Sequence, residues 1–246
     1  MDRLIYTALS GLSASMDRQR VIASNMANAQ TIGFRAELMD QRAVTIAGEQ
    51  PEVRAQQQAL VRSADMQGGE AVMTSRPLDI ALDGSALLAV QADDGSEAYT
   101  RRGDLSVRAD GLLVNGDGAM VIGEAGPITV PLTGRISVTP SGAVTVSDPA
   151  TPDLPAIEVA QLKLASPDGS QIAKGVDGLF RVVGGGILPT DEAATVKPGY
   201  LEQSNVKPTE VLVEMIDQQR LFEMRTKLVT TAKTIDESGA RLMRLI

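Results

Sequence analysis

The stretch SNMANAQTIGFR, residues 24–35, closes an amphipathic N-terminal segment and decides how the rest of the chain is organised. Before it, apolar residues recur in steps of three or four, which predicts one helix of roughly 39 Å. The two asparagines can end that helix, because asparagine tolerates the left-handed conformation at a helix C-terminus. A turn at the glycine then redirects the chain. We call this the hinge motif; its predicted residues are Asn25, Asn28, Thr31, Gly33 and Phe34.

The last forty residues predict a second and longer helix. Pro208 and Thr209 mark its start, and Glu210 is favourably placed in its first turn. The pattern continues without proline to the last residue, over roughly 57 Å. Apolar residues on this helix repeat every seven positions, an imperfect heptad of the kind that pairs helices. The residues expected to pack between the two helices are Ile5, Leu9, Leu12 and Met16 on the first and Leu221, Leu228, Ile235 and Leu242 on the second.

Between the helices the pattern changes to short apolar and β-branched runs separated by turns. Asp-Gly or Asn-Gly pairs occur at 94–95, 110–111, 115–116 and 168–169. Such pairs between alternating strands are strong hairpin signals. Strand-like runs every 8–12 residues, with no helical period between them, indicate an antiparallel all-β domain.

The sequence therefore predicts an α+β protein. Its N- and C-terminal helices pair as a coiled-coil-like stalk, and an antiparallel all-β domain is inserted between them. The predicted parts are a stalk helix at 1–30, a linker and hinge region at 31–77, a β-rich domain at 78–183, a return linker at 184–204 and a stalk helix at 205–246.

The amino-acid composition argues against most kinds of catalytic and metal-binding site. The 246 residues include no histidine and no cysteine, which removes the commonest general base and every thiolate nucleophile or ligand. No nucleophile–base pair is visible, so we expect no catalytic residue, no metal site, no cofactor and no enzyme activity. A net charge of −8 without a basic stripe argues against a nucleic-acid partner. No apolar run reaches the length of a membrane span, and the N-terminus does not resemble a cleaved signal peptide.

The apolar stripes need a partner. Within one chain they could pack against each other or against the β domain. A β domain of about 110 residues has a radius of gyration near 13 Å, however, and is too small to cover both helices. Part of each stripe would then be exposed in a monomer, which favours contacts with other subunits.

Three segments resemble the flagellar basal-body rod and hook protein family. The stretch 24–35 is similar to its N-terminal signature, and Gly11-Leu12 fits the preceding helix. YTRRGDLSVRADGLLV, residues 99–114, is similar to a β-domain segment of the family. GYLEQSNVKPTEVLVEMIDQQRLFEM, residues 199–224, is similar to the C-terminal signature, whose core here is Gly199, Leu201, Glu202, Ser204, Asn205 and Val206.

Two departures from the family pattern are visible. Ser24 stands where the family usually has a second asparagine, and Ala86-Leu87-Leu88 stands where a Gly-Phe-Phe strand is common. The second change keeps the strand apolar, so the fold expectation holds.

The resemblance implies a structural axial subunit of the bacterial flagellar rod that polymerises helically and transmits torque. Its partners would be other proximal and distal rod subunits, further copies of itself and the flagellar export apparatus. It would lie in the periplasm-spanning rod after type III export without a cleaved signal. The chain start and length resemble a proximal rod subunit, and a distal one is the alternative. From another class, a secreted β-domain glycan-binding module with a helical oligomerisation stalk remains open.

Overall fold

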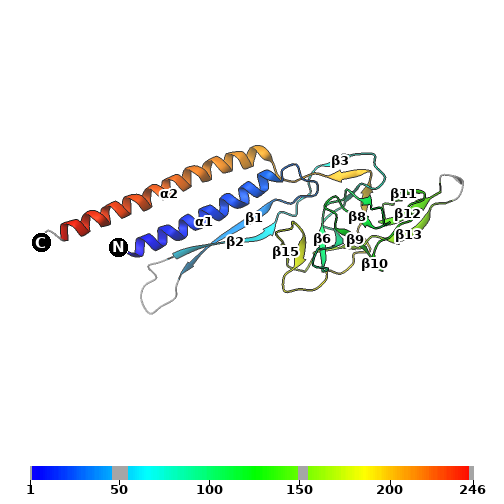
Figure 1. Ribbon diagram of the computed structural model, residues 1–246, viewed down its shortest axis with the longest axis horizontal. Coiled ribbons are helices and arrows are strands. Elements are labelled where there is room, and N and C mark those ends of the chain that lie inside the picture. Colours follow the sequence, from blue (N-terminus) through cyan, green and yellow to red (C-terminus); the bar gives the residue numbers. More distant parts are fainter. Residues whose placement is uncertain (1, 46–54, 149–154, 244–246) are drawn as a thin grey trace. The chain divides into compact units, whose positions relative to one another are not determined.

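The computed structural model describes residues 2–45, 55–148 and 155–243, and it divides into two compact units. The helical unit contains residues 1–27, 37–62 and 207–246, and the β unit contains 28–36 and 63–206. The helices and strands are drawn in Figure 1. This organisation agrees with the predicted α+β class, since a mostly antiparallel β region lies between the two terminal helices along the sequence.

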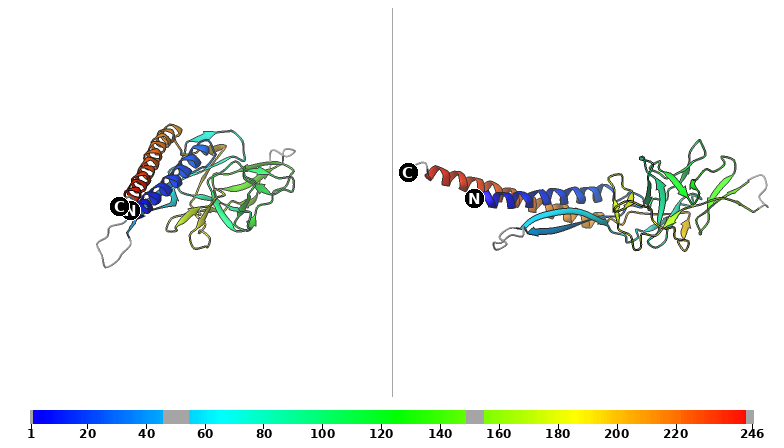
Figure 2. Two further views of the ribbon diagram at one scale, coloured as in Figure 1. Left: turned by 60° about the vertical axis from the view of Figure 1, so that its left-hand side comes forward. Right: turned by 90° about the horizontal axis from the view of Figure 1, so that it is seen from below.

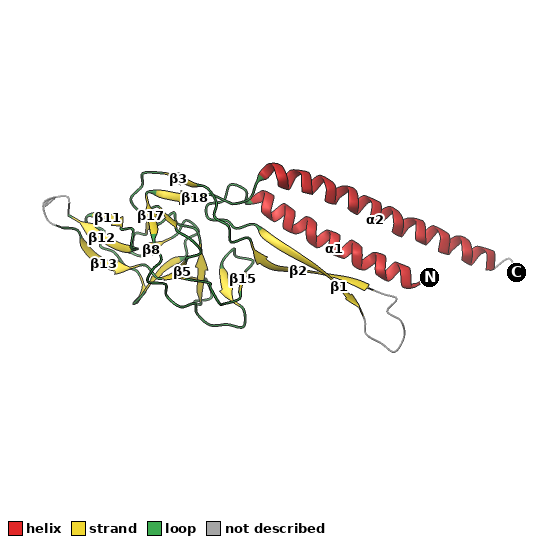
Figure 3. Ribbon diagram, turned by 180° about the vertical axis from the view of Figure 1, so that it is seen from behind, coloured by secondary structure: helices red, strands yellow, loops and turns green. Residues whose placement is uncertain are grey.

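The helical unit is built on two long helices. Helix α1 spans Asp2–Ala27 and helix α2 spans Pro208–Met243. They run antiparallel and side by side, so both chain ends lie at the same end of the pair (Figures 1 and 3). Pro208 begins α2 where the missing amide costs nothing, and Glu210 lies in its first turn, as predicted.

The same unit contains a two-stranded sheet in the range predicted as a linker. Strand β1, Glu37–Thr45, pairs with β2, Ala55–Ala64, and β1 lies along α1 (Figure 2, right). These strands are not predicted from the sequence, because their polar stretches, such as the glutamine run of β2, lack apolar alternation. Their pairing and the neighbouring helix supply what the local sequence does not.

The main sheet of the β unit contains nine strands among the described residues, along the order β15-β16-β6-β5-β9-β8-β7, with β14 on β5 and β10 on β9. All its ladders are antiparallel. Its strands are β5 Leu87–Gln91, β6 Glu97–Thr100, β7 Ser106–Val107, β8 Leu113–Val114, β9 Met120–Gly123, β10 Gly126–Pro127, β14 Leu164–Ala165, β15 Ile172–Lys174 and β16 Phe180–Val182.

Three smaller sheets complete the described part of this unit. One has the order β11-β12-β13, and the other two pair β17 with β4 and β18 with β3. The last two bring together segments more than 100 residues apart and place strands inside the predicted return linker. The bounds are β3 Ala71–Met73, β4 Ile80–Leu82, β11 Arg135–Val138, β12 Ala143–Ser147, β13 Ile157–Gln161, β17 Val196–Pro198 and β18 Tyr200–Glu202.

The Asp-Gly and Asn-Gly signals predicted the turns well. The pairs at 94–95, 110–111 and 115–116 lie in the turns of the β5–β6, β7–β8 and β8–β9 hairpins. The pair at 168–169 also makes a turn, but it joins β14 to β15, which pair with different strands. A tight turn fixes the local chain reversal, whereas distant contacts choose the partner strand.

Strand β5 lies at the centre of the core. Leu88 and Val90 point into one apolar cluster and Leu87 and Ala89 into another, so both faces of the strand are buried. The expectation that Ala86-Leu87-Leu88 forms an apolar strand segment is confirmed, since all three residues are buried. Tyr99 and Phe180 supply aromatic volume to the second cluster from neighbouring strands.

Candidate assembly surface and joint

Two arginines bond the helices of the pair to each other. Nε and Nη2 of Arg18 on α1 donate to Oε1 of Glu214 on α2 at 3.2 and 2.8 Å. Nη1 of Arg225 on α2 donates to the carbonyl oxygen of Gly11 at 2.5 Å and to Oγ of Ser15 at 2.7 Å. An arginine reaches the backbone of a helix only where side chains are small. Gly11 and Ser15 provide that opening on α1.

Two apolar rows can be distinguished on helix α2, and the exposed Leu212 and Ile216 lie between them around the helix. The first row is half-buried. It lies on the side of α2 that faces α1, since it is within a quarter turn of Glu214 and Arg225, whose side chains bond α1. We call the second the exposed row, because its members are exposed and lie mostly on the opposite side of the helix. The half-buried row is Val211, Met215, Phe222 and Val229, and the exposed row is Val213, Met224, Leu228 and Ile235.

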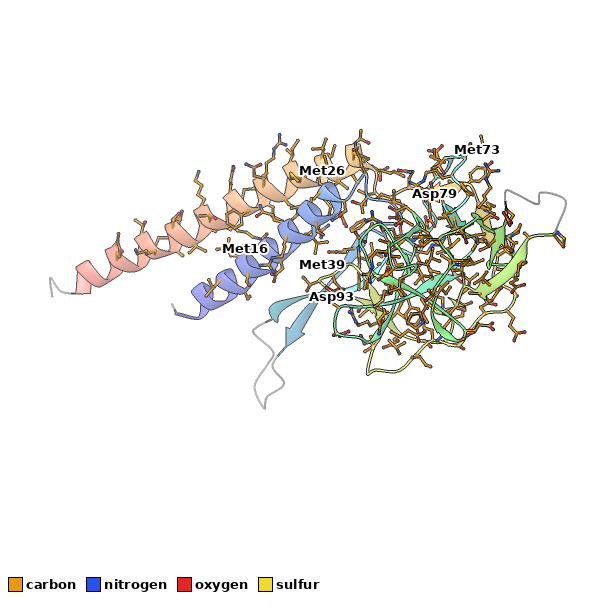
Figure 4. The ribbon with its side chains drawn as sticks, turned by 45° about the vertical axis from the view of Figure 1, so that its right-hand side comes forward. Met16, Met26, Met39, Met73, Asp79 and Asp93 are labelled. Atoms are coloured by element: carbon orange, nitrogen blue, oxygen red, sulfur yellow. The ribbon has the colours of Figure 1, made fainter. Side chains whose placement is uncertain are left out.

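The residues predicted to pack between the helices divide between these environments. Leu12 and Leu221 are half-buried. Four others are more than half exposed in the single chain: Leu9 at 56%, Met16 at 53% (Figure 4), Leu228 at 66% and Ile235 at 58%. The side chains of Ile5 and Leu242 lie outside the described residues. Packing of this set between subunits stays a prediction.

The Arg225 contacts give a first testable prediction. Arg225→Met keeps the length and helix propensity of the side chain but removes both of its hydrogen bonds to α1. We expect the helical unit to lose about 1–3 kcal/mol, the usual contribution of charge-assisted hydrogen bonds. Urea unfolding followed by the helical circular-dichroism signal measures it. Arg220→Met is the matched control, because Arg220 is exposed on the side of α2 that carries the exposed row; an equal loss would contradict the role of Arg225.

The end of α1 is held to the start of β1 by one asparagine. Oδ1 of Asn25 accepts from the amide of Glu37 at 2.8 Å, and Nδ2 of Asn25 donates to the Glu37 carbonyl oxygen at 3.1 Å. This two-way bond closes the intervening loop. Asn28 and Thr31 make a turn within it, in which Oγ1 of Thr31 donates to Oδ1 of Asn28 at 3.1 Å.

In the β unit, the chain after α1 meets the C-terminal motif. We call residues 28–36, 63–69 and 199–206 the joint. The amide of Gly33 donates to the carbonyl oxygen of Glu202 at 2.8 Å, and the amide of Ala36 donates to Oδ1 of Asn205 at 2.7 Å. Nδ2 of Asn205 donates to the carbonyls of Asp65 and Gln67 at 2.9 and 3.0 Å. One asparagine therefore bonds all three segments.

The carboxylate of Glu202 lies at the centre of the joint. Nε and Nη2 of Arg101 donate to Oε2 at 2.9 and 2.5 Å, and Nη2 of Arg35 forms an ion pair with Oε1 at 2.6 Å. The amide of Gly69 donates to Oε1 at 2.9 Å. Arg35, Arg101 and Glu202 are 1%, 2% and 3% exposed, so the three charges are almost completely removed from water.

Backbone carbonyls accept further hydrogen bonds from both arginines, although Nε and Nη2 of Arg35 have no hydrogen-bond partner among the described residues. Arg101 donates to the carbonyl oxygens of Leu82, Gly84 and Ala86, and Arg35 donates to that of Gln67. Burial lowers the pKa of the Arg35 guanidinium, and the neighbouring Glu202 carboxylate acts in the opposite direction.

The other motif residues shape or cover this network. Gly199 adopts a φ of +77°, and its amide donates to the Asp79 carbonyl oxygen at 2.7 Å; Figure 4 labels Asp79. Leu201 and Val206 are buried, and Oγ of Ser204 accepts from the amide of Val206 at 3.2 Å. Nζ of Lys174 lies 3.3 Å from the centre of the Phe34 ring, a cation–π contact that covers the turn.

Glu202 is predicted as a motif residue from the sequence, whereas the role of Arg101 and the burial of Arg35 are not predicted. An arginine in a strand-rich segment, such as Arg101, is expected at the surface. The signal lay in the three resembling segments, since each contributes one member of the charged network.

Three family models match consecutive parts of the chain. A model described as flagella basal body rod protein matches residues 5–35. One described as the flagellar hook protein FlgE/F/G D1 domain matches residues 81–146. One described as the flagellar basal body rod FlgEFG protein C-terminal matches residues 197–242. Arg35, Arg101 and Glu202 fall one in each match.

Full-length relatives agree with these matches. The flagellar basal-body rod protein FlgF of Salmonella typhimurium strain LT2 is 40% identical over 252 residues, covering 100% of this chain and 99% of the relative. The chain belongs to the flagellar basal-body rod protein family. FlgF of Escherichia coli strain K12 is likewise 40% identical over 100% of this chain and 99% of its own. FlgG of Agrobacterium fabrum strain C58 is 31% identical over 94% of this chain and 95% of its own.

The family identifies this rod protein as a structural subunit of the flagellar basal body. The prediction that it is not an enzyme is confirmed by these relatives, which are structural rod proteins. Both FlgF relatives have higher identity than the FlgG relative, so the chain is more similar to FlgF than to FlgG among these three proteins. In the described part of the chain, no helix is both long and apolar enough to span a bilayer.

Proposed function

We propose that this rod protein polymerises helically, with copies of itself and with other rod subunits, through its terminal helices. The exposed row of α2 is the observation that carries the proposal. Its members are separated by eleven, four and seven residues, close to whole numbers of helical turns, so they lie along one line of the helix, with Asp217 between Val213 and Met224. Exposed apolar residues aligned in this way favour burial against another apolar surface. Contacts that join unlike surfaces and do not close extend into a filament.

We also propose that the stalk residues of α1 and α2 pair in a coiled-coil-like manner in the assembled rod. Leu9, Met16, Leu228 and Ile235 would become buried there by neighbouring subunits. Helices packed over a long interface resist relative rotation, so such an assembly transmits torque along the rod. The hinge motif then redirects the chain from the stalk at 1–30 into the β-rich part, and the stalk at 205–246 completes the pair.

The location in the cell follows from the same proposal. The rod protein would leave the cytoplasm through the flagellar export apparatus without a cleaved signal and lie in the periplasm-spanning part of the rod. The higher identity to FlgF supports a proximal position.

A cysteine-protection experiment tests this function, because one introduced cysteine is the only thiol of this chain, whose band is separated from those of other basal-body proteins by electrophoresis. Leu228→Cys is placed in a strain lacking its own copy of the subunit, and a maleimide is added to the purified chain and to isolated basal bodies. We expect rapid labelling of the free chain, in which Leu228 is 66% exposed, and at least tenfold slower labelling in basal bodies.

Dissociating the basal bodies should restore rapid labelling, which controls for damage to the thiol. Equal labelling rates in the free chain and in basal bodies that contain it would contradict burial of the exposed row. Absence of the chain from basal bodies would contradict the rod function itself.

A further inference from the structure

The polypeptide passes between the helical unit and the β unit four times, at 27/28, 36/37, 62/63 and 206/207. Three segments of the β unit adjoin these crossings. Residues 28–36 lie between the first two, the segment beginning at residue 63 follows the third, and residues 199–206 precede the fourth. Any load carried by the backbone from one unit to the other passes through these segments.

Glu202 contacts all three segments. It belongs to the last of them, its Oε1 pairs with Arg35 of the first at 2.6 Å, and the same oxygen accepts from the amide of Gly69 in the second at 2.9 Å. Its other oxygen, Oε2, is held by Arg101, which is fixed in turn by the carbonyls of Leu82, Gly84 and Ala86. A single carboxylate thus connects the three segments next to the crossings with the β core.

We propose that the Glu202 carboxylate anchors the joint, so that all three connecting segments stay folded on the β unit before the helices pack against a neighbouring subunit. The physical reason is the burial of its partners. Without the carboxylate, two arginines that are almost inaccessible to water face each other uncompensated, and breaking a buried ion pair in this way is strongly destabilising. Arg35 lies in segment 28–36 and the Gln67 carbonyl of segment 63–69 accepts from it, so separation of these segments from the β unit would return its guanidinium to water.

Hydrogen exchange of the purified full chain tests this anchor. Glu202→Gln keeps the shape of the side chain and removes its charge. We expect the amides of Ala36, Asp65 and Gly69 to exchange at least tenfold faster, because the joint opens locally. The amides of Ala89 and Ile128, which bond inside the β core, should change less than threefold. Glu124→Gln is the matched control, since Glu124 is exposed on the same unit and the chemical change is identical.

Two further variants make the result decisive. Arg35→Lys keeps the charge but removes the planar guanidinium, and it should accelerate exchange of the same amides to a smaller extent. It replaces Glu202→Gln if that variant proves too unstable to purify. Asn205→Ala removes the neutral bonds to Ala36, Asp65 and Gln67. A larger opening in Asn205→Ala than in Glu202→Gln would overturn the proposal in favour of Asn205.

Uniform acceleration of joint and core amides would also overturn it, because the charged network would then stabilise only the whole unit. The same holds for unchanged exchange in Glu202→Gln. These measurements use the isolated chain and no flagellum, so their outcome is independent of the proposed rod function.

Discussion

Replacing Leu228 by aspartate is expected to abolish rod assembly and motility. The free energy of unfolding of the purified chain should stay within about 0.5 kcal/mol of the parent value, as for surface substitutions away from structural features. The two effects separate because Leu228 is 66% exposed in the single chain. Its replacement therefore removes little buried apolar surface from the monomer. In an assembled rod the same position would lose about 1.5–3 kcal/mol of apolar burial and place an unpaired carboxylate in an apolar contact. Every copy in the polymer carries this penalty.

The experiment compares Leu228→Asp with Gln219→Asp in a strain lacking its own subunit. Gln219 is exposed on α2 but lies outside the exposed row, so its variant adds the same charge to the same helix. Motility and the presence of the chain in isolated basal bodies are the readouts. Normal swimming with Leu228→Asp, or equal loss with Gln219→Asp, would contradict assembly through the exposed row.

How far the fold follows from sequence depends on the range of the interactions involved. Helices α1 and α2 and the hairpins at 94–95, 110–111 and 115–116 follow from local periodicity and turn chemistry. The pairings of β17 with β4 and of β18 with β3 could not be predicted, because nothing in a three-residue strand specifies a partner more than 100 residues away. The β1–β2 pair was missed for a related reason, since polar strands carry no alternation signal.

The candidate site divides in the same way. The sequence predicts that Asn25 and Gly33 end a helix and turn the chain, and the structure gives Asn25 a bond to Glu37 and Gly33 a positive φ. It cannot predict that Arg101 is buried beside Glu202, because burial of a charge depends on distant groups that compensate it. Residues that are needed for local backbone geometry can be predicted from a single sequence. A buried charge that is paired with distant groups can be identified only from the three-dimensional structure.

Gly33→Ala is expected to destabilise the β unit by about 3 kcal/mol or more, at the upper end of single substitutions. Gly33 has a φ of +67°, where a side chain costs about 1–2 kcal/mol. An added Cβ would also lie 2.5 Å from the carbonyl carbon of Arg101 and 2.6 Å from the amide nitrogen of Arg102. Those atoms are backbone, so the strain is relieved only by moving residues 101–102 or by separating segment 28–36 from them.

Gly84→Ala is the matched control for this substitution. Gly84 has a similar φ of +58°, but a Cβ added there would have no atom within 4 Å. It should show the conformational cost alone, about 1–2 kcal/mol. Urea unfolding of both variants, followed by the β-sheet circular-dichroism signal, then isolates the steric contribution at Gly33 as their difference. Equal destabilisation would mean that residues 101–102 yield to the new methyl group, and the hinge motif would then need glycine only for its backbone angle.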